Sequence, residues 1–284
     1  MTTSKVRVAA VQLASGSNTE ANIERALAGA SAAVASGATY VQLPEYFNYR
    51  GPTSGYHDVA ESVPGPTTAR LGEFAKDKNI TLHVGSMLER SPDPSKSYNT
   101  SVVIAPSGEI VATYRKGHLF DINVPGEVEQ YESRNIAPGD RLVVTDTPGF
   151  NLGLSVCFDL RFTEMYRRLS SHGATVLAVP SSFAVATGRV HWEVLLRARA
   201  IENHAYVIAA AQAGTTAEGL SSFGHSMIIG PWGEVLTESD IDGEDVLVAT
   251  IDTREVARRR SQIAVLELQR PRLYRSLPEP GGDD

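Results

Sequence analysis

The single cysteine of the chain occupies a position at which a nucleophile could be exposed. Cys157 directly follows Leu152–Val156, an apolar run that predicts a strand, and a helical pattern begins a few residues later. A sharp turn between a strand and a helix exposes a side chain and aims backbone N–H groups at a developing negative charge. A lone cysteine is more often an inert buried residue. Its place in the chain therefore makes Cys157 a candidate nucleophile.

Two charged residues occupy similar positions at predicted strand ends. Glu45 follows the apolar strand predicted at Tyr40–Leu43, and Lys116 follows the strand predicted at Ile110–Tyr114. Active sites of α/β proteins lie at the carboxyl ends of strands. A loop glutamate or lysine is ordinarily a solvated surface residue, so neither is informative alone.

Together, the three residue types are sufficient for acyl transfer. A thiol needs a base to become a thiolate, and a carboxylate with a raised pKa can take the proton. A nearby ammonium can stabilise the oxyanion that forms when the thiolate attacks a carbonyl carbon. Cys157, Glu45 and Lys116 therefore predict an acyl-transfer site without a metal. The chain also has seven histidines, any of which could reach the cysteine in space.

Apolar, β-branched runs alternate with helical patterns, which predicts a layered α/β fold. Asp121–Asp140 is the longest stretch predicted to be irregular. Helices are predicted at Asn18–Gly37 (with Asn18 as N-cap), Pro66–Asn79, Thr163–Ser170 and Arg189–Asn203. Strands are predicted at Val6–Leu13, Tyr40–Leu43, Ile80–Ser86, Ser101–Ile104, Ile110–Tyr114, Leu152–Val156, Val176–Val179, Tyr206–Ala211, Met227–Ile229, Val235–Leu236 and Val246–Ile251.

The chain contains a weak internal repeat. Gly37–Glu45 resembles Gly173–Ser181, and Ala105–Thr113 resembles Gly230–Glu238, at offsets of 136 and 125 residues. Two matches in the same order predict two similar α/β halves, packed sheet to sheet with helices outside. Because the halves would share one core, we predict a single domain over residues 1–277. The polar residues 278–284, rich in Gly and Pro, are predicted to form a disordered tail.

Composition excludes several classes of function. The formal net charge of −7 does not favour binding to nucleic acid. One cysteine permits neither an internal disulfide nor a zinc site built from thiolates. The sequence has no signal-peptide pattern and no apolar run of about 18 residues. We therefore expect a cytoplasmic protein that acts on a small molecule and has no nucleic-acid or membrane partner.

Three motifs carry a resemblance to a known family. LPEYF, YRKGHLFD and SVCFDLRF resemble, in order and spacing, the glutamate, lysine and cysteine motifs of the nitrilase superfamily, the carbon–nitrogen hydrolases. The resemblance extends from VAAVQL near the start to RPRLY near the end. It implies an α-β-β-α sandwich of two similar halves and a catalytic triad of Glu45, Lys116 and Cys157. It also implies that there is no cofactor and no metal, and that the protein forms a homodimer through its helical faces.

The family pattern also implies a second glutamate beyond the lysine. Its position within QYES assigns it to Glu132, with Glu127 and Glu129 as neighbouring alternatives. Phe158 follows the cysteine where relatives often have tyrosine, so it lacks that hydroxyl but keeps the backbone N–H that an oxyanion needs.

Further residues near the motifs are candidates for substrate binding. His191 and Trp192 begin a predicted helix and are expected to line the pocket. For Arg161 we expect an ion pair with Asp159 that shapes the turn, with substrate contact as the alternative.

A finer resemblance concerns the substrate. FDINVPGEVEQYES and HWEVLLRARAIE look like the branch that includes deaminated glutathione amidase and omega-amidase. This implies hydrolysis of the terminal amide of a small carboxylate-bearing substrate through a thioester. Deaminated glutathione is the first choice and 2-oxoglutaramate the alternative. A nitrilase, an N-carbamoyl amino acid hydrolase and an inactive binding or regulatory subunit also remain open.

Overall fold

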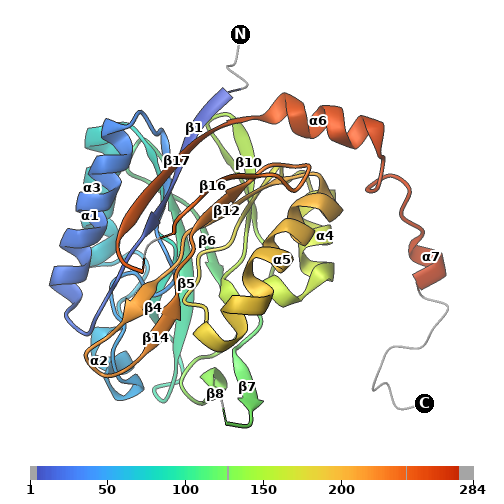
Figure 1. Ribbon diagram of the computed structural model, residues 1–284. Helices are drawn as coiled ribbons and strands as arrows, with labels where there is room; N and C mark the ends of the chain where they lie inside the picture. Colours follow the sequence, from blue (N-terminus) through green and yellow to red (C-terminus); the bar gives the residue numbers. More distant parts are fainter. Residues whose placement is uncertain (1–4, 127, 241, 275–284) are drawn as a thin grey trace.

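Two mixed β-sheets lie face to face, and helices cover their outer faces (Figure 1). The computed structural model describes residues 5–126, 128–240 and 242–274. Figure 1 shows α1 (Thr19–Ala35) and α3 (Pro66–Lys78) outside one sheet, and α4 (Thr163–Ser171) and α5 (Val185–Asn203) outside the other. The predicted four-layer α-β-β-α sandwich is therefore confirmed. The predicted disordered tail, 278–284, lies outside the described residues.

The first sheet has the order β17-β1-β2-β3-β5-β4, with β6 paired to β5, and the second has the order β16-β15-β12-β11-β10-β9. The strands of the first sheet are β1 (Lys5–Gln12), β2 (Tyr40–Gln42), β3 (Thr81–His83), β4 (Met87–Arg90), β5 (Ser97–Ile104), β6 (Ile110–Arg115) and β17 (Asp245–Asp252). Those of the second are β9 (Val144–Thr147), β10 (Phe150–Leu154), β11 (Val176–Ala178), β12 (Tyr206–Ala209), β15 (Met227–Ile229) and β16 (Val235–Glu238). Short hairpins pair β7 (Asp121–Val124) with β8 (Val128–Tyr131) and β13 (Ala213–Thr215) with β14 (Ser221–Phe223).

The two sheets repeat one topology. In the first, β1, β2 and β3 are parallel and are followed by antiparallel β5 and β6. In the second, β10, β11 and β12 are parallel and are followed by antiparallel β15 and β16. Both antiparallel pairs have a register irregularity near the turn, at Val103/Ile104 and at Ile228/Ile229. The internal repeat in the sequence therefore reflects two similar halves, as predicted.

Hydrophobic side chains and a few hydrogen bonds hold the two sheets together. Val8 and Tyr40 of the first sheet share one buried cluster with Leu152 of the second. The side chain of Gln42 donates to the carbonyl of Ile208 across the interface, at 2.9 Å. These bonds lie near the carboxyl ends of β2 and β12, and so they fix how the two sets of strand ends face each other.

The sequence patterns located most helices to within a few residues. The side chain of Asn18 caps α1 by accepting a hydrogen bond from the N–H of Ala21, at 3.0 Å. Helix α5 begins at Val185, earlier than the predicted start at Arg189. Gly188 in its first turn suggests a helix break, but a Cβ there would lie 2.4 Å from Phe223, so close packing requires the glycine.

The sequence patterns did not predict several short helices and strands that are mostly polar. Asp121–Asp140, predicted to be irregular, contains the β7–β8 hairpin and a 3₁₀ turn at Glu132–Arg134. Its strands contribute to neither sheet and have only four residues each, too few for an alternation to stand out in the sequence. Helices α2 (Tyr56–Val59), α6 (Thr253–Gln262) and α7 (Pro271–Tyr274) were also not predicted, because they bury almost no apolar residues. No helix in the described part of the chain is long and apolar enough to cross a lipid bilayer.

We predict that Gly85→Ala destabilises the fold beneath Glu45. Gly85 has φ +69°, and a Cβ there would lie 2.1 Å from the carbonyl oxygen of Pro44 and 2.3 Å from that of Leu43. A strained backbone costs about 1–3 kcal/mol, and the clash adds to this. Denaturant unfolding measures the change. Gly16→Ala is the matched control, because nothing lies within 4 Å of its Cβ position. Equal unfolding midpoints for the two variants would contradict the prediction.

Candidate active site

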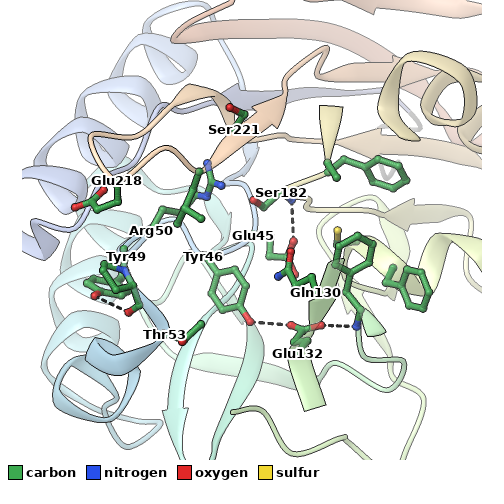
Figure 2. Close-up of a pocket in the computed structure, with 18 of the residues that line it drawn as sticks. Glu45, Tyr46, Tyr49, Arg50, Thr53, Gln130, Glu132, Ser182, Glu218 and Ser221 are labelled. Atoms are coloured by element: carbon green, nitrogen blue, oxygen red, sulfur yellow. Dashed lines mark hydrogen bonds between the residues drawn. The ribbon is translucent and has the colours of Figure 1, made fainter. Parts of the chain in front are cut away.

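Strand ends from both sheets meet at one cavity of about 710 Å³ (Figure 2). Glu45 lies just beyond β2 and Lys116 just beyond β6, both in the first half. Cys157 follows β10 and Ser182 follows β11, both in the second half. All four residues line the cavity, and Glu132 lines it as well. The docking of the two sheets therefore brings together the three residues that the sequence selected.

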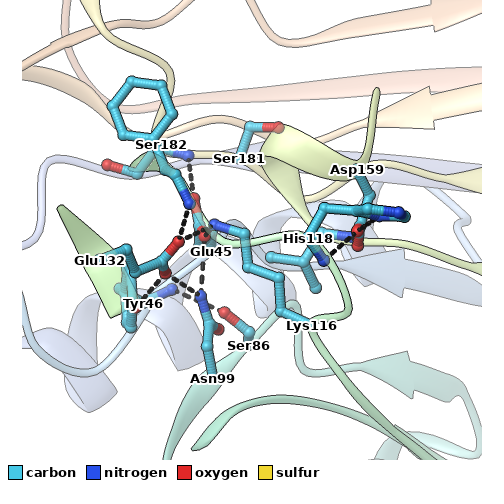
Figure 3. A network of polar contacts seen from close by, with 12 residues as sticks. Glu45, Tyr46, Ser86, Asn99, Lys116, His118, Glu132, Asp159, Ser181 and Ser182 are labelled. Atoms are coloured by element: carbon cyan, nitrogen blue, oxygen red, sulfur yellow. Dashed lines mark hydrogen bonds and ion pairs between the residues drawn. The ribbon is translucent and has the colours of Figure 1, made fainter. Parts of the chain in front are cut away.

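The ammonium of Lys116 lies between two carboxylates (Figure 3). Its Nζ is 3.0 Å from Oε1 of Glu45 and 2.8 Å from Oε2 of Glu132, and its side chain is only 2% exposed. Burial by itself would lower the pKa of Lys116, but the charges of Glu132 and Glu45 raise this pKa well above its usual value. The lysine is therefore held as a cation.

Glu132 is held by several donors. The Tyr46 hydroxyl donates to its Oε1 at 2.8 Å, and the N–H of Phe120 donates to Oε2 at 2.7 Å. Burial would raise the pKa of Glu132, but Lys116, the Phe120 N–H and the Tyr46 hydroxyl together lower this pKa below its usual value. Of the neighbouring alternatives, Glu129 lines the cavity but has no ion pair with any described residue, and Glu127 lies outside the described residues.

The carboxylate of Glu45 is fixed from both halves of the chain. Its Oε1 accepts hydrogen bonds from Asn99 Nδ2 at 2.8 Å and from Lys116 Nζ. Its Oε2 accepts one from the backbone N–H of Ser182, at 2.8 Å. Both oxygens are thus oriented at a buried position beside the cysteine.

Cys157 lies at a sharp turn between β10 and a 3₁₀ turn, Cys157–Arg161. Its φ of +49° is uncommon for a residue with a side chain. The Cys157 N–H donates to the carbonyl of Pro180 at 2.9 Å. The next N–H, that of Phe158, donates to no acceptor among the described residues, so it is available to an oxyanion.

The surroundings of Cys157 favour the neutral thiol over the thiolate. Burial raises its pKa well above the usual value, and the negative charge of Glu45 raises it further, whereas Lys116 lowers it. A base is therefore needed to make the thiolate. Glu45 is placed to be that base, because its buried carboxylate lines the same cavity as the thiol and its charge acts on the thiol.

Asp159 connects the cysteine turn to the loop after Lys116 through hydrogen bonds. Its buried carboxylate accepts from the N–H of Val156 at 2.8 Å and the Tyr114 hydroxyl at 2.7 Å. It also accepts from the backbone N–H of His118 at 3.0 Å and contacts the His118 ring at 2.7 Å. The predicted ion pair between Asp159 and Arg161 is wrong, because these groups occupy the carboxylate.

Of the other residues predicted to contact the substrate, one lines the cavity and three do not. Phe158 lines the cavity. The guanidinium of Arg161 lies over the rings of Phe158 and Phe183, 5.6 and 5.3 Å from their centroids, and is not among the lining residues. His191 is exposed, and Trp192 is fully buried, with its indole N–H donating to the carbonyl of His225. Neither of these two residues of α5 lines the cavity.

Several residues of the site were missed by the sequence analysis. Asn99 donates to both Glu45 and Glu132 from within β5. An asparagine inside a buried strand is unusual, and this was a usable signal. Ser182 acts through its backbone N–H, which no side-chain pattern reveals. Arg50 lines the cavity too, and its only signal was a charge within an aromatic run.

The arrangement contains a thiol, a base, a fixed cation and a free N–H, which is what acyl transfer through a covalent thioester requires. In the described ranges, no group of three or more His, Cys, Asp or Glu side chains could hold a metal ion. All groups needed for this chemistry come from the chain's own residues.

Known proteins share both the sequence and the fold. The family model described as carbon-nitrogen hydrolase matches residues 7–261. Omega-amidase NIT2 of Mus musculus is 40% identical over 271 residues, covering 95% of this chain and 97% of its own. The crystal structure of the C. elegans NitFhit protein has a TM-score of 0.90 at 36% identity, covering 96% of this chain and 67% of that one.

An amidase structure of the nitrilase superfamily is also similar. In a variant of the amidase from Nesterenkonia sp. AN1, the acetamide moiety of fluoroacetamide is covalently attached at the active-site cysteine. That structure has a TM-score of 0.80 at 26% identity, covering 96% of this chain and 97% of its own. From the site geometry, the matched family and the full-length similarity, we conclude that this chain belongs to the carbon-nitrogen hydrolase family of the nitrilase superfamily.

Proposed function

We propose that this protein is a cysteine-dependent amidase that releases ammonia from the terminal amide of a small carboxylate-bearing substrate. The observation that carries the proposal is the buried Lys116 ammonium, held between Glu45 and Glu132 beside the Cys157 turn. The same cation that orients the base can stabilise an oxyanion.

The first half of the reaction forms a thioester. Glu45 takes the proton from the thiol of Cys157, and the thiolate attacks the amide carbon. The oxyanion of the tetrahedral intermediate accepts hydrogen bonds from Lys116 and from the N–H of Phe158. Glu45 then donates the proton to the amide nitrogen, the carbon–nitrogen bond breaks and ammonia leaves.

The second half releases the acid. Glu45 takes a proton from a water molecule, which attacks the thioester carbon to give a second oxyanion at the same donors. The carbon–sulfur bond then breaks, the proton returns to the cysteine and the carboxylic acid product leaves. Glu132 takes no part in proton transfer in this scheme; it is a positioning residue that keeps Lys116 charged and fixed.

For the substrate, we propose the short α-keto acid 2-oxoglutaramate. The support is the similarity to omega-amidases along nearly the whole chain, which favours this alternative over deaminated glutathione, our first choice from the sequence. The cavity of about 710 Å³ is within the usual range for small-molecule sites.

We predict that Cys157→Ala abolishes ammonia release and leaves the fold intact. No other thiol exists in the chain, and alanine cannot form the thioester. Ammonia release should be measured on 2-oxoglutaramate, with the unfolding midpoint as a check on the fold. Cys157→Ser tests the nucleophile more finely, because a hydroxyl of similar size is a far weaker acid and should also be inactive. Near-wild-type turnover by the alanine variant would refute the mechanism.

We predict that Lys116→Ala lowers kcat by about 10²–10³-fold, the usual loss for one oxyanion donor, about 2.7–4 kcal/mol. Lys116→Arg should not restore activity, because the planar guanidinium of arginine is larger than the compact ammonium of lysine. The Lys116 side chain is buried, so the site has no room for the larger group. Steady-state kinetics measure both effects. Lys78→Ala removes an exposed lysine as the control. Retention of most activity by the arginine variant would show that only a generic cation is needed.

We predict a preference for acidic amides of short length. The comparison is of kcat/KM on 2-oxoglutaramate and deaminated glutathione, with glutamine and simple aliphatic amides as controls. We expect the highest value on 2-oxoglutaramate, because the similar proteins are omega-amidases. A higher value on deaminated glutathione would change the substrate and leave the chemistry unaltered. High, equal rates on the aliphatic amides would show that no carboxylate is recognised.

A further inference from the structure

A buried guanidinium in the cavity wall has no partner. Arg50 lines the cavity (Figure 2), and the residue is only 9% exposed. Its Nη1 is fully buried without a hydrogen bond, and no ion pair joins the side chain to any residue that the structure describes. Its backbone N–H donates to the carbonyl of Gly16 at 2.8 Å, which anchors the residue at this place. A charge that is buried without a partner is costly.

Two other arginines of the described residues, the buried Arg199 and the half-buried Arg260, are satisfied by the protein. Arg199, 3% exposed, donates to the carbonyl of Leu160 and pairs with Glu202. Arg260 donates to two backbone carbonyls. Arg167 also has a buried nitrogen without a partner, but it does not line the cavity. An arginine that is both unpartnered and on the cavity wall therefore has a ligand as its natural partner.

The charges around the cavity favour an anion at Arg50. Burial lowers the pKa of Arg50, whereas Glu45, Tyr56 and Cys157 raise it, which places the guanidinium within electrostatic range of the reacting groups. Lys116 is already paired with two carboxylates, and the proposed mechanism assigns it to the oxyanion, so the carboxylate of a substrate requires a different cation. Glu129 and Glu218 also line the cavity, but neither forms an ion pair with Arg50. Glu218 interacts with Ser17 and Thr216 instead.

We propose that Arg50 binds the carboxylate of the substrate and thereby selects acidic ω-amides over neutral ones. This inference rests on the proposed amidase function. A guanidinium can donate two parallel hydrogen bonds to a carboxylate, which fixes the substrate's orientation as well as its position. With the carboxylate held at Arg50, the other end of a short substrate lies toward Cys157. Arg50 is thus a specificity-determining residue that takes no part in the covalent steps.

The experiment compares two amides that differ in charge and not in length. Succinamate carries a carboxylate where butyramide carries a methyl group. We expect Arg50→Met to lower kcat/KM on succinamate by about 10²-fold, mostly through KM, because it removes hydrogen bonds between charged groups. On butyramide the change should stay within about threefold. Arg50→Lys keeps the positive charge but cannot donate two parallel hydrogen bonds. Its kcat/KM on succinamate should therefore lie between the values of the wild type and of Arg50→Met.

Two further variants serve as controls. Arg141→Met removes an exposed arginine and should leave both substrates unaffected. Arg161→Met tests the nearest rival, because Arg161 lies over Phe158 and Phe183. A selective loss on succinamate in Arg161→Met, with Arg50→Met unchanged, would overturn the assignment. So would equal losses on both amides in Arg50→Met, which would indicate a structural role.

A binding measurement separates failure of this inference from failure of the proposed function. Titration calorimetry of succinamate into Cys157→Ala measures binding without turnover, and the double variant with Arg50→Met measures the contribution of the guanidinium. Weaker binding by about 10²-fold in the double variant supports the inference even if the wild type hydrolyses neither amide. Unchanged binding overturns it, even if the wild type is an active amidase.

Discussion

The ammonium of Lys116, buried between the carboxylates of Glu45 and Glu132, is the interaction on which the rest of the site depends. Burying three charges is costly unless each remaining donor and acceptor is satisfied. The chain meets this requirement with groups from distant segments, namely the side chain of Asn99, the hydroxyl of Tyr46 and the N–H groups of Phe120 and Ser182. Asn99 and Ser182 fix the orientation of Glu45, and the base is therefore oriented before any substrate arrives.

The repeated topology of the two halves explains how such a cluster can form. Residues that follow strands of both sheets line one cavity, but the residue types differ between the halves, so the halves contribute different chemistry. The first supplies the charged groups and the second supplies Cys157 and the N–H of Ser182. Asp159 connects the two contributions, since its carboxylate binds both the cysteine turn and His118 on the lysine side. It also helps to hold Cys157 at a positive φ, a conformation that costs about 1–3 kcal/mol.

The parts of the site that sequence could predict are those with a local signature. Glu45, Lys116 and Cys157 each follow an apolar strand, and the repeat revealed the two halves. Ser182 contributes a backbone N–H, and Arg50 does not directly follow an apolar strand, so neither residue had such a signature. The helical pattern located α5 but not its rotation about its axis. Trp192 consequently faces the core and His191 faces solvent, although both were expected at the pocket.

The division of the site between the halves has a consequence for the newly synthesised chain. Both carboxylates and the lysine are synthesised before the nucleophile, because Glu132 precedes Cys157 in the chain. Cys157 and Ser182 follow, and β17, which pairs with β1 along its whole length, comes more than sixty residues after Ser182. The reactive thiol is thus assembled late in translation. The site and the sandwich that surrounds it are therefore completed together, near the end of synthesis.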